Sequence, residues 1–219
     1  MRKRLVITID GPSGAGKSTM AKRLASRLGY KYLDTGAMYR AVAYACAKGP
    51  AVPDLEPFLS NLTLRFVFGD STQVFLDDED ISLHIRTPEI SLMASRLSQD
   101  PRVRGYLTNM QREMGRDGGI VLEGRDTGSV VFPDAEVKFF LDADMNERAR
   151  RRCLELAARG PGGDLEQVKE EMQKRDRDDS ERDIAPLIRP EGAVYVDTTG
   201  LDIEGVVRVL TERVRGVLQ

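Results

Sequence analysis

The stretch from residue 5 to residue 19, LVITIDGPSGAGKST, contains an apolar run, a glycine-rich turn and then Lys-Ser-Thr at the start of a helical pattern. It fills the pattern G-x-x-x-x-G-K-[ST], whose backbone N–H groups surround phosphate oxygens, whose lysine reaches the outer phosphates and whose hydroxyl binds Mg²⁺. The apolar run indicates a buried strand, and the apolar spacing after the turn indicates a helix, which is the order that the motif requires. The residues expected to hold the phosphates of ATP are Gly11, Pro12, Ser13, Gly14, Ala15, Gly16, Lys17, Ser18 and Thr19, with Ser18 as the Mg²⁺ ligand.

Length and composition describe a globular protein with one α/β domain, expected to span residues 1–219. The chain has 219 residues, of which 41% are hydrophobic and 31% charged, and its net charge is −2. Such a balance leaves no large basic surface for nucleic acid, so we expect no nucleic-acid partner. Because no apolar run approaches the roughly 20 residues that cross a bilayer, we expect no membrane partner and a cytoplasmic location. A monomer is expected.

The cysteines and the single histidine do not suggest a catalytic or metal site. Cys46 and Cys153 lie far apart in apolar helical patterns, without the second cysteine nearby that a zinc site would need, and are expected to be small core residues. His84 stands in an alternating segment without a Cys, His or carboxylate cluster around it, so a surface position is expected.

Strands near residues 5, 31, 120, 138 and 194, separated by helical patterns, predict a doubly wound parallel sheet. The carboxyl ends of parallel strands face the same edge, where ligands bind. Two polar turns fall at this edge, at residues 34–36 and 123–126. Thr35 and Arg40 beside the first turn are therefore candidates for binding a second ligand.

Residues 62–86 differ from the rest of the chain in their pattern of apolar and polar residues. Three short alternating segments, 62–68, 73–76 and 81–86, are separated by polar turns at 69–71 and 77–80. These are hairpin signals, so we expect a small antiparallel insertion beside the main sheet. The acidic run 77–80 is interpreted as a solvated turn in preference to a metal site.

Two very charged helical patterns, 145–156 and 165–179, enclose the sequence GPGG at 160–163. Their arginines alternate with acidic residues, which is typical of solvated helices that carry ion pairs four residues apart. The alternative is a mobile lid, at about 150–182, over a phosphate-rich cleft. We favour the lid, because the phosphate loop supplies the anion that its arginines would cover.

A phosphate loop on such a sheet occurs in GTPase switches, motor ATPases and small-molecule kinases. The chain contains no Asn-Lys-x-Asp guanine signature, and it is too short for the additional segments of a motor. A kinase is therefore favoured. A regulatory nucleotide switch, or a nucleotide-binding protein whose arginine-rich lid contacts RNA, remains as an alternative.

Several motifs beyond the phosphate loop resemble those of the bacterial cytidylate kinase family, a member of the nucleoside monophosphate kinase group. They are LDTGAMYR at 33–40, PRVR at 101–104, EGRD at 123–126, VFPDA at 131–135, RDRDDSER at 175–182 and APL at 185–187. The resemblance covers nearly the whole chain, and it includes the enlarged monophosphate-binding region at about 35–115. It implies a five-stranded P-loop sheet with a helical lid, and Mg²⁺-dependent transfer of the γ-phosphoryl group of ATP to CMP or dCMP, giving ADP and CDP or dCDP.

The same resemblance implies a role for each matching residue. Arg40, Arg125 and Arg182 would hold the acceptor phosphate near Thr35. Cytosine would be read by Ser95, Arg104 and Asp126, and the ribose held by Arg175 with Asp179. The catalytic residues would be Lys17, Arg125 and Arg182. UMP is the alternative acceptor, although a carboxylate such as that of Asp126 favours the amino group of cytosine over the carbonyl oxygen of uracil. One departure from the pattern is Asp178, where some relatives have another arginine.

Overall fold

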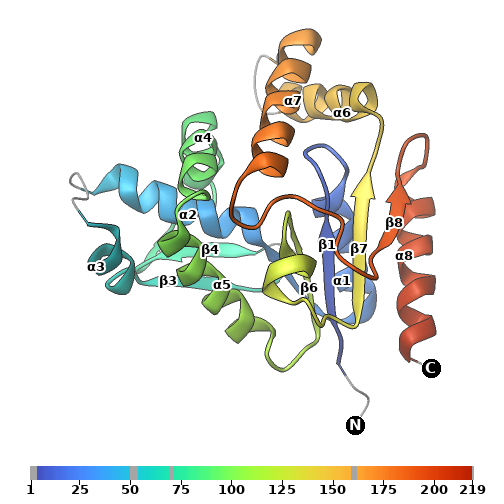
Figure 1. Cartoon of the computed structure of the whole chain (residues 1–219), viewed down its shortest axis with the longest axis horizontal. Coiled ribbons are helices and arrows are strands. Elements are labelled where there is room, and N and C mark those ends of the chain that lie inside the picture. The colour runs from blue at the N-terminus through green and yellow to red at the C-terminus, as the bar shows by residue number, and fades with distance from the viewer. Residues whose placement is uncertain (1–3, 50–53, 70–71, 159–161, 219) are drawn as a thin grey trace.

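A five-stranded parallel sheet in the order β2-β6-β1-β7-β8 forms the centre of the computed structural model, which describes residues 4–49, 54–69, 72–158 and 162–218. Its strands are β1 (Val6–Asp10), β2 (Lys31–Asp34), β6 (Ile120–Gly124), β7 (Val137–Asp142) and β8 (Val194–Asp197). The helices are α1 (Lys17–Leu28), α2 (Thr35–Lys48), α3 (Leu55–Ser60), α4 (Pro88–Leu97), α5 (Pro101–Gly115), α6 (Met145–Ala157), α7 (Leu165–Glu181) and α8 (Ile203–Leu218). The predicted doubly wound sheet is confirmed (Figure 1).

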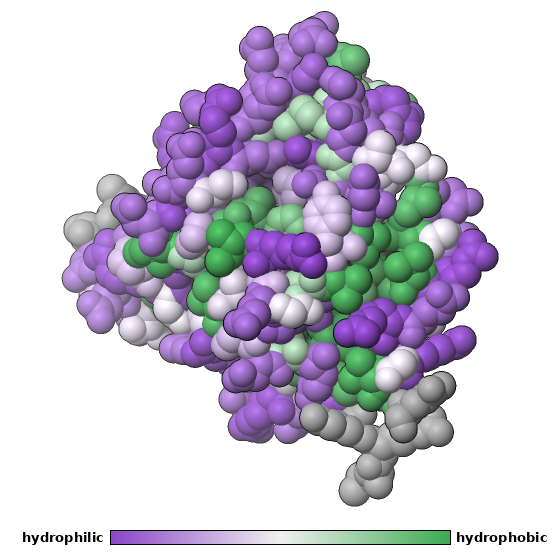
Figure 2. Space-filling model, turned by 45° about the vertical axis from the view of Figure 1, so that its right-hand side comes forward, coloured by the Kyte–Doolittle hydropathy of each residue, from purple (hydrophilic) through white to green (hydrophobic). Residues whose placement is uncertain are grey.

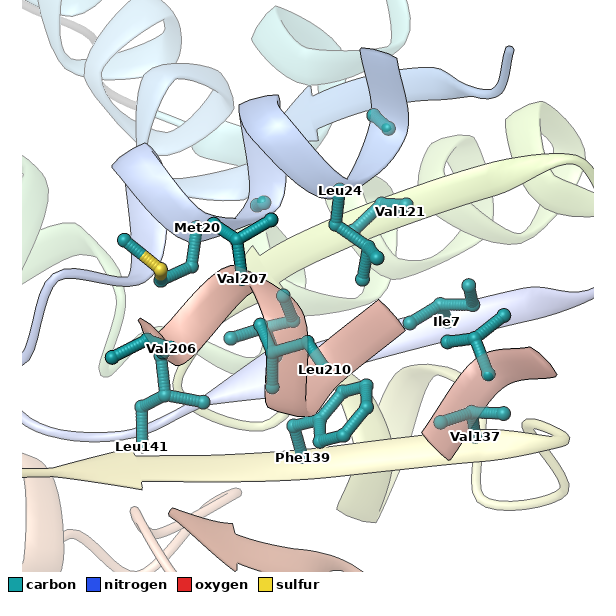
Figure 3. Close-up of a cluster of buried hydrophobic side chains, with 14 of the residues drawn as sticks. Ile7, Met20, Leu24, Val121, Val137, Phe139, Leu141, Val206, Val207 and Leu210 are labelled. Carbon is teal, nitrogen blue, oxygen red and sulfur yellow. The ribbon is translucent and has the colours of Figure 1, made fainter. Parts of the chain in front are cut away.

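The central strand β1 is buried on both sides because its side chains alternate between two cores. Ile7 and Ile9 pack against α1 and α8, in the core that Figure 3 shows. Val6 faces the other core, which α2, α4 and α5 share with β6. A strand covered on both faces needs apolar residues at successive positions, which explains the unbroken apolar run that precedes the phosphate loop.

The predicted insertion is an antiparallel sheet of three strands, β3 (Leu64–Val67), β4 (Gln73–Leu76) and β5 (Glu79–Asp80). The prediction of a strand at 81–86 is wrong. The third strand is instead Glu79–Asp80, inside the acidic run that was interpreted as a turn, and only the two residues before it make the turn. Residues 84–86 form a short 3-10 helix, η1 (His84–Arg86). Residues 70–71 of the other predicted turn lie outside the described residues.

The two predicted lid helices, α6 and α7, stand above the carboxyl ends of the strands (Figure 1). The upper part of the molecule that they form is mostly hydrophilic on the face shown in Figure 2. A small apolar core of Ala149, Val168 and Met172 joins them. Polar contacts, described below, connect the two helices to the phosphate loop. Residues 159–161 of the predicted joint lie outside the described residues.

The described residues also show where the cysteines and the single histidine lie. Cys46 and Cys153 are unpaired and half-buried at the margins of two cores, and His84 is exposed. No metal-binding cluster of His, Cys, Asp or Glu is found among the residues that the structure describes. Within the same residues, no helix has both the length and the apolar character to span a membrane.

Candidate active site

The phosphate loop follows β1 and owes its shape to three glycines. A Cβ atom on Gly11 would lie 1.9 Å from the carbonyl oxygen of Leu141, so only glycine allows β1 to pass this close to β7. Gly14 and Gly16 have φ angles of +76° and +87°, in the left-handed region that favours glycine. The loop therefore wraps tightly in front of α1, whose N-terminus adds partial positive charge.

Lys17 and Ser18, the first residues of α1, are held by buried oxygen acceptors. The ammonium of Lys17 donates to the carbonyl oxygen of Pro12 at 2.6 Å, and burial together with the charge of Arg125 lowers its pKa to about 7. The Ser18 hydroxyl donates to Oε1 of Glu123 at 2.5 Å.

Glu123 is a buried carboxylate at the end of β6, beside the phosphate loop. It also accepts a hydrogen bond of 3.0 Å from the Tyr32 hydroxyl, and its backbone carbonyl accepts one of 2.7 Å from Thr35. Burial and the nearby charge of Asp34 raise the pKa of the Glu123 carboxyl. The Glu123 side chain thus connects the start of α1 with β2, and its backbone carbonyl holds the first residue of α2.

Ion pairs between arginines and carboxylates line the opposite side of the site. Arg40 contacts Asp34 at 2.9 Å, and Arg125 contacts Asp179 of α7 at 2.8 Å. Burial opposes ionisation of Asp179, but the guanidiniums of Arg125 and Arg175 hold its pKa below the usual range.

Two buried guanidinium donors at this site lack a hydrogen-bond partner in the part of the chain that the structure describes. They are Nε of Arg40 and one terminal nitrogen, NH2, of Arg182. That nitrogen of Arg182 is 3.9 Å from the carboxylate of Asp126, too long for a hydrogen bond. Buried N–H groups without a partner are costly, so these donors indicate a place for an anionic ligand.

The carboxylate of Asp126 is the main partner of Arg104. The two buried side chains form a close ion pair, and Arg104 also donates to the carbonyl oxygen of Ser98 at 2.9 Å. The Arg104 guanidinium lies 5.6 Å from the centre of the Tyr39 ring. These contacts form a polar wall with an aromatic side, suited to a planar heterocycle.

One cavity of about 420 Å³ contains both halves of the site. With the exception of Gly11, Pro12 and Ala15, which shape the loop from behind, every residue predicted to bind a nucleotide lines it. Nine basic and five acidic side chains line this cavity, an excess of four formal positive charges in a chain whose net charge is −2. The cavity is therefore suited to polyanions.

Comparison with known proteins identifies the family. The model of the family described as "Cytidylate kinase" matches residues 7–216. The chain belongs to the cytidylate kinase family. A protein named cytidylate kinase from Syntrophotalea carbinolica is 50% identical over 222 residues, covering 97% of this chain and 94% of the relative. Another of that name from Geobacter sp. is 49% identical, covering 96% and 93%.

The fold is similar to that of a solved kinase outside the cytidylate kinase family. A shikimate kinase structure from Bacteroides thetaiotaomicron superposes with a TM-score of 0.52 at 15% identity, covering 96% of this chain and 98% of that one. At this identity the likeness concerns the fold alone.

The structure adds residues to this cytidylate kinase family site that sequence reasoning did not assign. Asp34, Tyr39 and Glu123 line the cavity from within motifs that the sequence had already singled out. Their positions at the ends of β2 and β6, or one helical turn beyond, could have indicated from sequence that they belong to the site. Arg152 of α6 also lines the cavity, whereas Asp178 is exposed and does not.

The helices of the proposed lid contact the phosphate loop directly in this family member. Arg148 of α6 donates to the carbonyl oxygen of Ser13 at 3.0 Å and pairs with Asp176 of α7. The other carboxylate oxygen of Asp176 accepts the N–H of Ser13 at 3.3 Å. These contacts place α6 and α7 over the loop that would hold ATP.

Proposed function

We propose that this member of the cytidylate kinase family transfers the γ-phosphoryl group of ATP to CMP or dCMP, giving ADP and CDP or dCDP. The observation that carries the proposal is the single cavity, with a phosphate loop on one side and unpartnered buried arginine donors on the other. Two phosphate-bearing ligands can thus be held end to end. Family membership, with relatives named cytidylate kinase, supports cytidine as the acceptor nucleoside.

At the donor end, the loop 11–19 would hold the β and γ phosphates of ATP, with the Lys17 ammonium beside them. The residues also fit Mg²⁺, because hydroxyl and carboxylate oxygens are the ligands that it prefers. The Ser18 hydroxyl would hold the ion, with Glu123 as the acceptor that orients this hydroxyl. When bound, Mg²⁺ would neutralise charge on the phosphates.

At the acceptor end, we assign the phosphate of CMP to Arg40, Arg125 and Arg182, near Thr35. The unpartnered donors of Arg40 and Arg182 favour this assignment, because a phosphate oxygen would satisfy them. The second pKa of a nucleotide phosphate is about 6, so the acceptor is already an anion at neutral pH and needs no general base. The side chains only have to bring two polyanions together and exclude water.

We assign the cytosine edge to Ser95, Arg104 and Asp126. The carboxylate of Asp126 can accept from the amino group of cytosine, whereas it would face the carbonyl oxygen of uracil. Arg175 and Asp179, one turn apart on α7, are assigned to the ribose. We assign catalysis to Lys17, Arg125 and Arg182, because their positive charges would stabilise the charge that develops on a phosphoryl group passing between the two ends of the cavity.

The test is ADP formation from ATP and Mg²⁺, measured with CMP, dCMP, UMP, AMP or no acceptor. A cytidylate kinase forms ADP only when an acceptor is present, with the highest kcat/KM for CMP or dCMP. Highest activity with UMP would support the other acceptor. Slow ADP formation that is independent of any acceptor would instead identify a nucleotide switch and overturn the proposal.

A further inference from the structure

Asp10, the last residue of β1, is a fully buried carboxylate to which the proposed mechanism assigns no part. It accepts three hydrogen bonds from two adjacent residues. The N–H and hydroxyl of Thr127 donate to Oδ1 at 2.9 and 2.7 Å, and the N–H of Gly128 donates to Oδ2 at 2.7 Å. Both carboxylate oxygens are therefore engaged by one short segment.

The segment that Asp10 holds begins directly after the acceptor side of the cavity. Thr127 and Gly128 are the first residues of a short π-helical turn, η2 (Thr127–Val131). Arg125 and Asp126, which immediately precede it, contact Asp179 and Arg104. A shift of this turn would thus displace the groups assigned to the acceptor phosphate and to the base together.

The turn fits closely against its neighbours, so the carboxylate fixes its position within a narrow range. A Cβ atom on Gly128 would lie 2.6 Å from the Thr8 hydroxyl and 3.3 Å from Oδ2 of Asp10. A Cβ atom on Gly124, in front of the turn, would lie 2.6 Å from the Thr35 hydroxyl. Neighbouring groups thus crowd the turn on these sides, and its hydrogen bonds to Asp10 set its position against β1.

The phosphate loop starts from the same residue. Gly11 directly follows Asp10, and its contact with Leu141 fixes the backbone there. Asp10 is also paired in register with Gly124 of β6. The Asp10 side chain therefore holds the acceptor side of the cavity. Its main chain leads directly into the phosphate loop on the donor side.

The ionised side chain is costly at this position. Burial raises the pKa of Asp10 to about 6, although the hydrogen bonds from Thr127 and Gly128 oppose this rise. An asparagine would carry no charge, but it has only one oxygen. If that oxygen accepts from Thr127, the amide NH2 of the asparagine faces the N–H of Gly128, and neither of these two donors has an acceptor. Only a carboxylate offers acceptors to all three donors.

We propose that Asp10 is a positioning residue that holds residues 124–128, from the end of β6 to the start of η2, in register with the phosphate loop. This inference rests on the proposed function, because it concerns the placing of CMP relative to ATP. Asp10 touches neither nucleotide in this assignment and acts through Arg125 and Asp126.

The test compares KM for CMP and for ATP in Asp10→Asn and the wild type. Leaving one buried N–H without an acceptor should shift the turn and raise KM for CMP about tenfold or more, with KM for ATP changed less than about twofold. A purely structural role would lower the melting temperature and leave both KM values unchanged. That result, or an equal rise in both KM values, would overturn the inference.

Thr127 provides a second, independent test that leaves β1 intact. Thr127→Val removes one of the three donors and should also raise KM for CMP. Thr127→Ser keeps the hydroxyl and should leave KM for CMP at the wild-type value. Thr211→Val is the matched control, because it removes a buried hydroxyl that donates to the carbonyl oxygen of Val207 at 2.6 Å in α8. If Asp10→Asn does not fold, the Thr127 pair decides alone.

A double variant separates this inference from other effects on KM. If Asp10 and Thr127 act through their contact, Asp10→Asn combined with Thr127→Val should raise KM for CMP by less than the product of the single effects. Independent effects would contradict the inference. A wild-type enzyme without CMP-dependent ADP formation would overturn the proposed function and this inference together, whereas an active wild type with unresponsive variants would overturn this inference alone.

Discussion

Lys17 combines a buried position with the nearby positive charges of Arg125 and Arg175. Only 6% of its surface is exposed, and burial with the charge of Arg125 lowers its pKa to about 7. ATP phosphates beside the ammonium would raise this pKa again. The residue should therefore change its protonation state when the donor nucleotide binds.

This yields a prediction for ATP binding at pH 8 without divalent metal. A pKa of about 7 leaves most Lys17 side chains neutral at this pH, so binding should take up about one proton per site. Calorimetry in buffers of different ionisation enthalpy measures the uptake. Lys17→Met should bind ATP more weakly and without proton uptake; equal uptake by this variant would assign the proton to another group.

The Asp126 carboxylate pairs with Arg104, and we also assign it to the cytosine edge, so a substitution must separate these two roles. If it accepts from the cytosine amino group, Asp126→Asn should weaken CMP more than UMP, whose carbonyl oxygen can accept from the new amide. A charged hydrogen bond is worth roughly 1.5 to 3 kcal/mol, or one to two decades in the ratio of kcat/KM for CMP and UMP. An unchanged ratio would leave Asp126 only the orientation of Arg104.

Residues whose role depends on local sequence could be predicted from sequence, and residues whose role depends on strand register could not. Lys17 and Ser18 occupy fixed places in a loop motif, so their surroundings follow from the chain itself. Asp10 and Glu123 act on segments more than 100 residues away, through the parallel pairing of β1 with β6. Nothing in the neighbouring sequence of Asp10 indicates which donors it will meet.

At the scale of elements, the insertion shows how an alternating pattern misleads. Ile81, Leu83 and Ile85 alternate as in a half-buried strand, yet Leu83 is 82% exposed while the other two are fully buried. Buried residues four positions apart are typical of a helical turn, which η1 completes. Asp77, with a φ of 52°, forms the hairpin turn and thereby lets Glu79 pair with Leu76.

The two lid helices, α6 and α7, lead to a prediction about movement, because polar contacts connect them to the phosphate loop at the sheet edge. Closure over bound nucleotides would exclude water and prevent loss of ATP by hydrolysis. Hydrogen exchange in the described parts of residues 150–182 should therefore slow when both nucleotides are bound. Helix α8 packs with α1 against the sheet and does not belong to the proposed lid, so its exchange is the internal control. Equal exchange with and without ligands would reject the lid and favour a fixed pair of solvated helices.

At the scale of the whole molecule, the fold brings the residues of the candidate site together at one edge of the sheet. The strand order β2-β6-β1-β7-β8 places the ends of β1, β2 and β6 side by side, so three polar turns from distant parts of the sequence meet in one cavity. The doubly wound pattern was predictable because every strand is followed by a turn signal or a helix. The pairing of Asp179 with Arg125 was not, since it depends on α7 lying over the sheet.

The central claim is that this one cavity holds both nucleotides for direct transfer between them. The most direct test is calorimetric titration with an analogue in which adenosine and cytidine are joined through five phosphates. Because linkage makes the second binding event intramolecular, one analogue should bind per chain with a Kd at least about 100-fold below that of ATP or of CMP. Binding of two analogues per chain, or a Kd no lower than that of the tighter single nucleotide, would contradict the account.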